Sequence, residues 1–417
     1  MQAERAADQA RAAAAARAHA GETRPVVVLA GEGRGGGHRA VMAALAESFL
    51  GLYGAALHLV ALPSLVRQGG ALLRLVARVP GAERWLERPG AAAVARRWLG
   101  GRRLAARLHA HGAHAVVFTH PAAAALGAAS LGAPAAGAGR AAAGACPPAF
   151  AVCTDPGSWV RRGWAHPALT RVFCATEQAR AALLERGLAP EQVVLSGMPV
   201  RRAFFARPAL DPERVRAGLG LAPARPTMLV VADRQSCRRE LAVLQAVLAA
   251  APALQLIYVG RDGGGLRAAT RLGRRYPGRL AAVAHTRELE LLLAASELLL
   301  APPGGTLIFE AAARGVPVLV LAMRSLPPQR EATAQLVEQT GIGCAVREPA
   351  ALGPALRRAL EPPQRAAWQA RLAALVHPGS AERVALEVAA ALGVRPPLER
   401  LVPAAEPGLR HRSGHGS

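Results

Sequence analysis

The stretch PVVVLAGEGRGGGHRA, residues 25–40, decides how this chain folds. It begins with a short apolar run that is typical of a buried strand. A glycine-rich turn follows, in which Gly31, Gly33 and Gly36 have the GxGxxG spacing found between a strand and a helix. We expect a helix from about His38 onward. A strand, a tight turn and a helix form the repeating unit of a parallel α/β sheet.

The same unit recurs along the chain. Apolar runs predict strands at 25–30, 57–62, 115–120, 149–154, 171–176 and 192–197, and again at 227–232, 254–260, 279–285, 297–302 and 316–322. We therefore predict an α/β protein with two doubly wound, Rossmann-like parallel-sheet domains. Ligands of such sheets bind beyond the carboxyl ends of the strands, so we expect the site in a cleft between the two domains.

Shifts in composition indicate the boundaries of these domains. We expect a disordered Ala/Arg-rich leader at 1–24, a first domain at 25–205, a Pro- and Gly-rich linker at 206–226, a second domain at 227–377, a C-terminal helix at 378–394 and a disordered tail at 395–417.

The composition is that of a globular protein with an unusual charge. Of the 417 residues, 52% are apolar, which is enough for two cores. All 51 basic residues are arginine, and the formal net charge is +23. GC-rich coding enriches arginine and alanine without functional demand. The positive charge therefore has two possible explanations, a soluble surface rich in arginine or an attraction for phosphate or anionic lipid. An aromatic content of 4% argues against a stacking platform for nucleic acid.

The cysteines and the apolar runs indicate the compartment. The five cysteines form no CxxC pair and have no metal-ligand spacing with histidine, so we expect buried thiols in a reducing compartment and no metal site. The N-terminus lacks the apolar core of a signal peptide, and no run reaches about 18 uninterrupted apolar residues. We therefore expect a cytoplasmic protein, peripheral on the inner face of the plasma membrane.

The turn at 31–40 admits several functions. A dinucleotide-dependent oxidoreductase also needs an acidic residue where the second strand ends, and that place reads HLVALPSL (58–65). A purely structural turn is a second interpretation. In the third, the glycines let the backbone approach a ligand, and His38 lies at the start of a helix, where free N–H groups favour anions. An imidazole there can deprotonate an acceptor hydroxyl.

Four motifs carry a family resemblance. They are the GGGHRA turn at 35–40, Thr154-Asp155 with Trp164-Ala165-His166-Pro167, Ala175-Thr176-Glu177 with Gly197-Met198-Pro199-Val200-Arg201, and PGGTLIFEAAARGVP at 303–317. From about residue 25 to about 375 the chain resembles the monogalactosyldiacylglycerol synthase and processive diacylglycerol glucosyltransferase family. It is more distantly similar to the N-acetylglucosaminyltransferase that completes the lipid-linked peptidoglycan precursor.

The resemblance implies a GT-B glycosyltransferase. We expect a UDP-sugar donor, a diacylglycerol-like lipid acceptor, an anionic membrane surface as partner, inversion at the transferred sugar, and no cofactor, metal or nucleic acid. The first domain would then lie on the acceptor and membrane side, and the second would bind the nucleotide sugar.

The resemblance also implies roles for individual residues. His38 or Asp155 would be the catalytic base, although Asp155 could also be a simple helix cap. The nucleotide sugar would contact the backbone at Gly36 and Gly37. His120 could face the same cleft, and His166 is expected to be structural.

The donor would be held mainly by the second domain. Gly304, Gly305 and Thr306 precede a helix, so their N–H groups and hydroxyl can hold a diphosphate without a metal. Glu310, one turn later, would accept hydrogen bonds from the ribose hydroxyls, and Gln329 would contact the sugar.

Two departures from the family alter the donor site. No glycine remains in the loop at 231–239, where Arg234 could replace backbone contacts by charge. Near the sugar, the family's glutamate is Arg330 and its asparagine is Thr333. Either the donor differs from galactose and glucose, with Arg330 contacting it, or the chain is a catalytically silent nucleotide-sugar- or lipid-binding protein.

The stretch 64–110 is basic and helical in pattern, and it contains apolar faces and two tryptophans, Trp85 and Trp98. It is either a helix at the membrane interface or an ordinary amphipathic helix packed on the sheet.

Overall fold

The computed structural model describes residues 24–31, 36–62, 101–131, 147–232, 237–260, 263–323, 326–397 and 400. The predictions for the leader up to residue 23, for 63–100, for the loop at 233–236 with Arg234, and for the tail from 401 lie outside the described residues.

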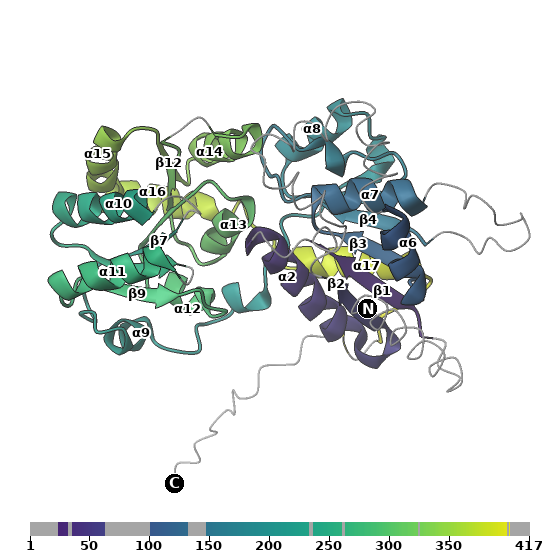
Figure 1. Ribbon diagram of the computed structural model, residues 1–417, viewed down its shortest axis with the longest axis horizontal. Coiled ribbons are helices and arrows are strands. Elements are labelled where there is room, and N and C mark those ends of the chain that lie inside the picture. Colours follow the sequence, from purple (N-terminus) through teal and green to yellow (C-terminus); the bar gives the residue numbers. More distant parts are fainter. Residues whose placement is uncertain are drawn as a thin grey trace, which may run out of the picture.

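The first domain is built on a six-stranded parallel sheet (Figure 1). Its strands, in spatial order, are β2 (His58–Leu62), β1 (Val26–Ala30), β3 (Ala115–Phe118), β4 (Ala149–Val152), β5 (Arg171–Cys174) and β6 (Val193–Leu195). Its helices are α2 (Gly36–Tyr53), α6 (Gly101–Ala110), α7 (Pro121–Leu131) and α8 (Glu177–Glu185).

The side chains of β1 point alternately to the two faces of the sheet, and both faces are covered. Val27 and Leu29 pack in one core with α2, whereas Val26 and Val28 pack on the opposite face in a core with α7 and α8. Successive side chains of a strand point to opposite faces, so a run of fully apolar residues fits only a sheet buried on both sides.

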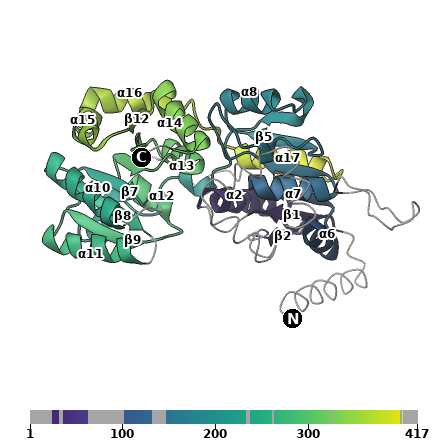
Figure 2. The ribbon, with the colours of Figure 1, turned by 45° about the horizontal axis from the view of Figure 1, so that its top comes forward.

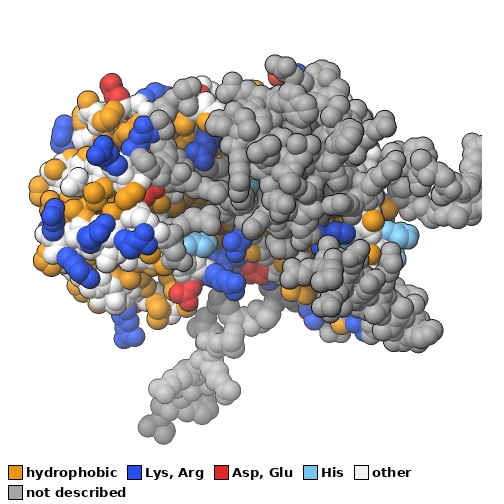
Figure 3. Space-filling model, in the orientation of Figure 1, with side chains coloured by type: hydrophobic (Ala, Val, Ile, Leu, Met, Phe, Trp, Pro, Cys, Tyr) orange, Lys and Arg blue, Asp and Glu red, His pale blue; other side chains and the backbone are white. Residues whose placement is uncertain are grey.

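The second domain repeats this plan. Its parallel strands, in spatial order, are β12 (Gly343–Val346), β11 (Val318–Leu321), β10 (Leu298–Ala301), β7 (Thr227–Val231), β8 (Gln255–Gly260) and β9 (Leu280–Ala284). The helices α12 (Leu289–Ala294), α13 (Gly305–Ala313) and α14 (Pro328–Thr340) lie on the side of the sheet that faces the first domain (Figures 1 and 2). The outer side carries α10 (Cys237–Ala250), α11 (Gly264–Arg275), α15 (Pro349–Leu360) and α16 (Pro362–Leu372), and arginine side chains gather there in Figure 3.

The C-terminal helix α17 (Ser380–Ala390) returns to the first domain. It packs on α2, although it follows the second sheet in the sequence (Figure 2). The chain passes between the two domains twice, once after Gly197 and once before α17. Gly197, which has a φ of +82°, lies against His377 and Ser380, so these two segments are neighbours.

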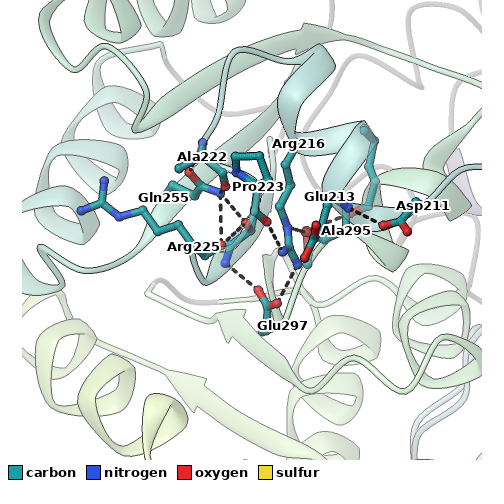
Figure 4. Close-up of polar contacts among 12 residues, drawn as sticks. Asp211, Glu213, Arg216, Ala222, Pro223, Arg225, Gln255, Ala295 and Glu297 are labelled. Atoms are coloured by element: carbon teal, nitrogen blue, oxygen red, sulfur yellow. Dashed lines mark hydrogen bonds and ion pairs between the residues drawn. The ribbon is translucent and has the colours of Figure 1, made fainter.

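The segment 206–226, predicted as the linker, folds onto the second domain and contains a helix, α9 (Pro212–Gly218). The buried Arg216 donates to the carbonyl oxygens of Ala295 (2.9 Å) and Pro223 (2.7 Å), and it pairs with Glu297 at 2.7 Å (Figure 4). Gln255 joins the same network by accepting from the Ala222 amide. The segment is therefore fixed to the second sheet.

The prediction of two parallel α/β domains is confirmed, with differences at the ends of elements. Strand β12 was not predicted from the sequence. Several strands end earlier than predicted, because Thr119 and Thr154 follow β3 and β4 instead of lying within them. In the part of the chain that the structure describes, no helix has the length and apolarity to cross a membrane.

Candidate functional site

Two helices begin where the domains meet. Helix α2 follows β1, and α13 follows β10, so both first turns lie at carboxyl ends of central strands. A Cβ atom added to Gly37 would lie 2.8 Å from the Thr306 hydroxyl, and one added to Gly305 would clash with the Thr154 carbonyl oxygen. These two predicted site glycines thus let the domains approach each other closely.

The other two predicted glycines have room beside them. Among the described residues nothing lies within 4 Å of a Cβ atom added to Gly36, and only the Pro302 carbonyl oxygen, at 3.8 Å, lies near one added to Gly304. These positions leave space for a ligand next to the backbone.

Thr306 lies between the two helix starts. Its side chain is 2% exposed, and its hydroxyl has no hydrogen-bond partner among the described residues. A buried polar group without a partner is costly, so such a group needs an explanation. The N–H groups of a helix start favour an anion, which would accept a hydrogen bond from this hydroxyl.

Glu310 is in α13, one turn after Thr306. It is 6% exposed, and no hydrogen bond ties its carboxyl group to another described residue. Burial raises its pKa to about 8; Arg201 acts in the opposite direction, and Glu290 adds to the rise. Arg201 is itself paired with Glu290 at 2.6 Å. Burial thus favours the protonated, uncharged form of this carboxyl group, and its oxygens are available to a ligand.

His38, in the first turn of α2, contacts residues of the neighbouring strands. Its Nδ1 lies 3.2 Å from the Thr154 hydroxyl, and its ring lies edge-on to His120 with centroids 4.7 Å apart. Burial and then the charge of Arg161 lower the pKa of His38 to about 4, against the smaller effects of Asp155 and the Thr119 backbone. His120, whose Nδ1 accepts from the Ala122 amide, also has its pKa lowered well below the usual value, mainly by burial.

Asp155 has its carboxylate fully engaged. Arg161 donates to it from Nε (2.9 Å), Nη2 (2.6 Å) and the backbone N–H (3.1 Å), and the Trp164 indole donates at 2.8 Å. Burial acts to raise the pKa of Asp155, but Arg161 and these hydrogen bonds hold it below the usual value. The side chain, 4% exposed, fastens the loop 155–164 beneath His38. Arg161 was not predicted from the sequence as a site residue.

Gln329 and Arg330 lie in the first turn of α14. Two residues further on, Ala332 packs against Gly157, so this turn lies beside the loop that follows β4. Thr333, at the position of the family's asparagine, is buried and donates to the Gln329 carbonyl oxygen at 2.7 Å.

Two further predictions concern residues outside this group. His166 Nδ1 accepts from the Ala168 amide within a turn, which agrees with a structural role. Of the basic stretch 64–110, the part from Gly101 forms α6, which packs on α7. For that part, the ordinary amphipathic helix is the better interpretation.

Part of the sequence resembles a known family. Residues 89–200 match the family model of monogalactosyldiacylglycerol (MGDG) synthase. The processive diacylglycerol beta-glucosyltransferase of Bacillus pumilus is 25% identical over 195 residues, which are 46% of this chain and 49% of that protein. The chain thus spans about half the length of the curated relatives it matches.

The comparison of structures gives the fold. Staphylococcus aureus MnaA, in its structure with UDP, has a TM-score of 0.59 at 13% identity, covering 89% of this chain and 97% of that one. Anabaena Alr3699/HepE, in complex with UDP-glucose, has a TM-score of 0.53 at 15% identity, covering 88% and 99%.

The chain is therefore an α/β protein of the GT-B fold, as the sequence predicts. The predicted resemblance to the MGDG synthase and processive diacylglycerol glucosyltransferase family is also confirmed.

Proposed function

We propose that this protein transfers a sugar from a UDP-sugar to a diacylglycerol-like lipid at a membrane surface, with inversion at the anomeric carbon. The observation that carries the proposal is the start of α13. There an unpartnered buried hydroxyl, on Thr306, and a carboxyl group without a hydrogen bond, on Glu310, lie one helical turn apart.

The UDP part of the donor suits these two groups. A diphosphate at the start of α13 would accept hydrogen bonds from the helix N–H groups and from Thr306, in the space beside Gly304. The ribose hydroxyls would donate to Glu310, which the bound ligand would favour in its ionised form. Gln329 and Arg330 would then contact the sugar from the first turn of α14.

His38 suits the role of base better than Asp155 does. Four donors from Arg161 and Trp164 already occupy the Asp155 carboxylate, so it is suited to hold the loop in place. The neutral His38 imidazole is in the form that accepts a proton. With a pKa of about 4 it is a weak base, and the negative charge of a bound diphosphate would raise that pKa toward neutrality.

The names of the relatives support a lipid acceptor. Its members in the comparison are named for diacylglycerol and MGDG. We propose that the chain works as a cytoplasmic protein on the inner face of the plasma membrane, where its net charge of +23 would attract anionic lipid.

A catalytically silent UDP-sugar- or lipid-binding protein is the second candidate. The low pKa of His38 and the arginine at position 330, where the family has a glutamate, both favour it.

The experiment that separates the two candidates follows the reaction products. The chain is incubated with UDP-glucose, UDP-galactose, UDP-N-acetylglucosamine or UDP-glucuronate and vesicles containing diacylglycerol. Free UDP and glycosylated lipid are measured together by mass spectrometry. Both products should appear with at least one donor and be lost in Glu310→Ala. Binding of UDP without either product would support the silent protein.

A further inference from the structure

Helix α11 presents a row of arginines to solvent. It buries Ala268, Ala269 and Leu272 against the outer face of the second sheet. Its exposed arginines, spaced as i, i+4, i+7 and i+8, are Arg267, Arg271, Arg274 and Arg275. Residues at this spacing share one side of a helix. We call these four residues the α11 arginine row.

The α11 arginine row has no neutralising partners among the described residues. The helix contains no acidic residue, and none of the four arginines forms an ion pair within the part of the chain that the structure describes. Some other surface arginines are paired, for example Arg202 with Glu382 and Arg347 with Glu331 and Glu338. The row differs from the scattered unpaired arginines because it places four of them on one side of one helix.

The row works against the stability of its own helix. Arg267 and Arg271, and again Arg271 and Arg275, are like charges four residues apart, which repel each other on a helix surface. A partner that supplies negative charge would relieve this repulsion. Such repulsion in the free protein is what we expect of a surface that binds a negatively charged partner.

The surrounding surface extends the positive charge. Helix α10 lies between α11 and α15 on the same side of the sheet, and it begins with the exposed Arg238. Helix α15 adds the exposed Arg357. Glu240, the acidic residue in the first turn of α10, accepts a hydrogen bond from the Tyr258 hydroxyl and covers the first turn of α11 instead of facing the arginines. Figure 3 shows arginine side chains distributed over the visible face of the second domain.

The chemistry of the row fits a layer of phosphate groups. A guanidinium group binds phosphate through two parallel hydrogen bonds, and the row from Arg267 to Arg275 extends about 12 Å along the helix, enough to reach more than one phosphate group. Between the arginines lie Ala, Thr, Leu and Gly, so the row has no aromatic side chain on which a base could stack.

We propose that the α11 arginine row docks the second domain on an anionic lipid membrane. The choice of a lipid partner rests on the proposed function; the positive surface does not. The protein would then contact the membrane through its donor-binding domain as well as through whatever the first domain contributes.

The test is vesicle binding by the full chain, with no donor present. Vesicles of phosphatidylcholine with 30% phosphatidylglycerol are compared with pure phosphatidylcholine by sedimentation at low and physiological salt. The test variant carries glutamine at Arg267, Arg271, Arg274 and Arg275. The matched control, which loses the same charge at scattered exposed sites, carries glutamine at Arg207, Arg214, Arg287 and Arg383.

Each arginine at an anionic surface strengthens binding about fivefold, so the test variant should bind the anionic vesicles at least about tenfold more weakly. The control should lose much less, and neither variant should unfold below the wild-type temperature; relief of the repulsion should leave the test variant at or slightly above it. Equal losses in the two variants, or none in the test variant, would overturn the proposal. So would a wild-type chain that binds single-stranded RNA through the row but no vesicle.

Sugar transfer is scored separately. A chain that docks through α11 and transfers no sugar would refute the proposed function and leave the docking surface standing.

Discussion

Glu310→Gln separates the charge of this side chain from its shape. The carboxyl group is 6% exposed, and burial raises its pKa from 4.5 to about 8 in the folded chain. The folded state therefore holds the proton more tightly than the unfolded state does. Below pH 4.5 both states carry the proton, so there is no penalty. Between pH 4.5 and 8 the unfolded chain has lost the proton and the folded chain keeps it, so the free energy of unfolding falls as pH rises.

The size of the effect follows from the shift. One pKa unit corresponds to about 1.36 kcal/mol, so the wild type should lose roughly 3–5 kcal/mol over this range. Glutamine has the same shape and no charge to bury. Relative to the wild type, Glu310→Gln should gain stability by about 1.4 kcal/mol per pH unit up to pH 8 and stay level above it.

Urea unfolding of the ligand-free chain from pH 5 to pH 9 measures this difference. The matched control is Glu185→Gln, at an exposed position of α8. Its stability should run parallel to the wild type at every pH. If Glu310→Gln also ran parallel, Glu310 would be ionised in the folded chain, and the interpretation of Glu310 as a buried, desolvated carboxyl group would be wrong.

The proposed base His38, the Asp155 ion pair and the proposed sugar contact of Arg330 give three further predictions. His38→Ala should lower turnover by about 10²–10⁴ and leave UDP affinity unchanged, whereas wild-type turnover would leave this histidine a structural role. Asp155→Asn removes the buried carboxylate that pairs with Arg161 and should lower the free energy of unfolding by about 3–5 kcal/mol. Because the folded-state pKa of Asp155 is lowered, this gap should be full above pH 4 and close as pH falls, and a gap independent of pH in urea titrations would contradict the ion pair. Arg330 suits a carboxylate on the donor, so UDP-glucuronate should react faster than UDP-glucose and Arg330→Glu should reverse the order; faster reaction of UDP-glucose with both proteins would show that position 330 does not select the sugar.

Most of the strands were predictable because both of their faces are buried. Strands covered on both faces are apolar at nearly every position, and such runs stand out in the sequence. Strand β12 has four residues, Gly343–Val346, and follows Gly341 closely, so it lacks a run long enough to recognise. Thr119 and Thr154 were included in strands because threonine favours extended backbone, although both lie just past the last paired residue.

The N-terminus of helix α9 has a recognisable sequence pattern, but the segment was predicted as a linker. Asp211 accepts a hydrogen bond from the Glu213 amide, and Pro212 is the first helical residue, which is a strong pattern for a helix N-terminus. The many Pro and Gly residues of 206–226 favoured a linker. The burial of Arg216, which fixes the segment, depends on residues 79 and 81 positions away.

The site was predictable in its position and less so in its contacts. Parallel sheets bring the ends of β1, β4 and β10 to the junction of the domains, which places His38, Asp155 and Thr306 together. That Gly37 packs on Thr306 depends on how the two domains meet, which no local pattern encodes. The pairing of Arg161 with Asp155 likewise depends on the path of the loop between them.

A structure of the chain with a bound UDP-sugar tests the central claim most directly. The account predicts the diphosphate at the start of α13, within hydrogen-bond distance of the Thr306 hydroxyl, and both ribose hydroxyls on the Glu310 carboxylate. UDP bound elsewhere, with Thr306 and Glu310 still lacking partners, would contradict it.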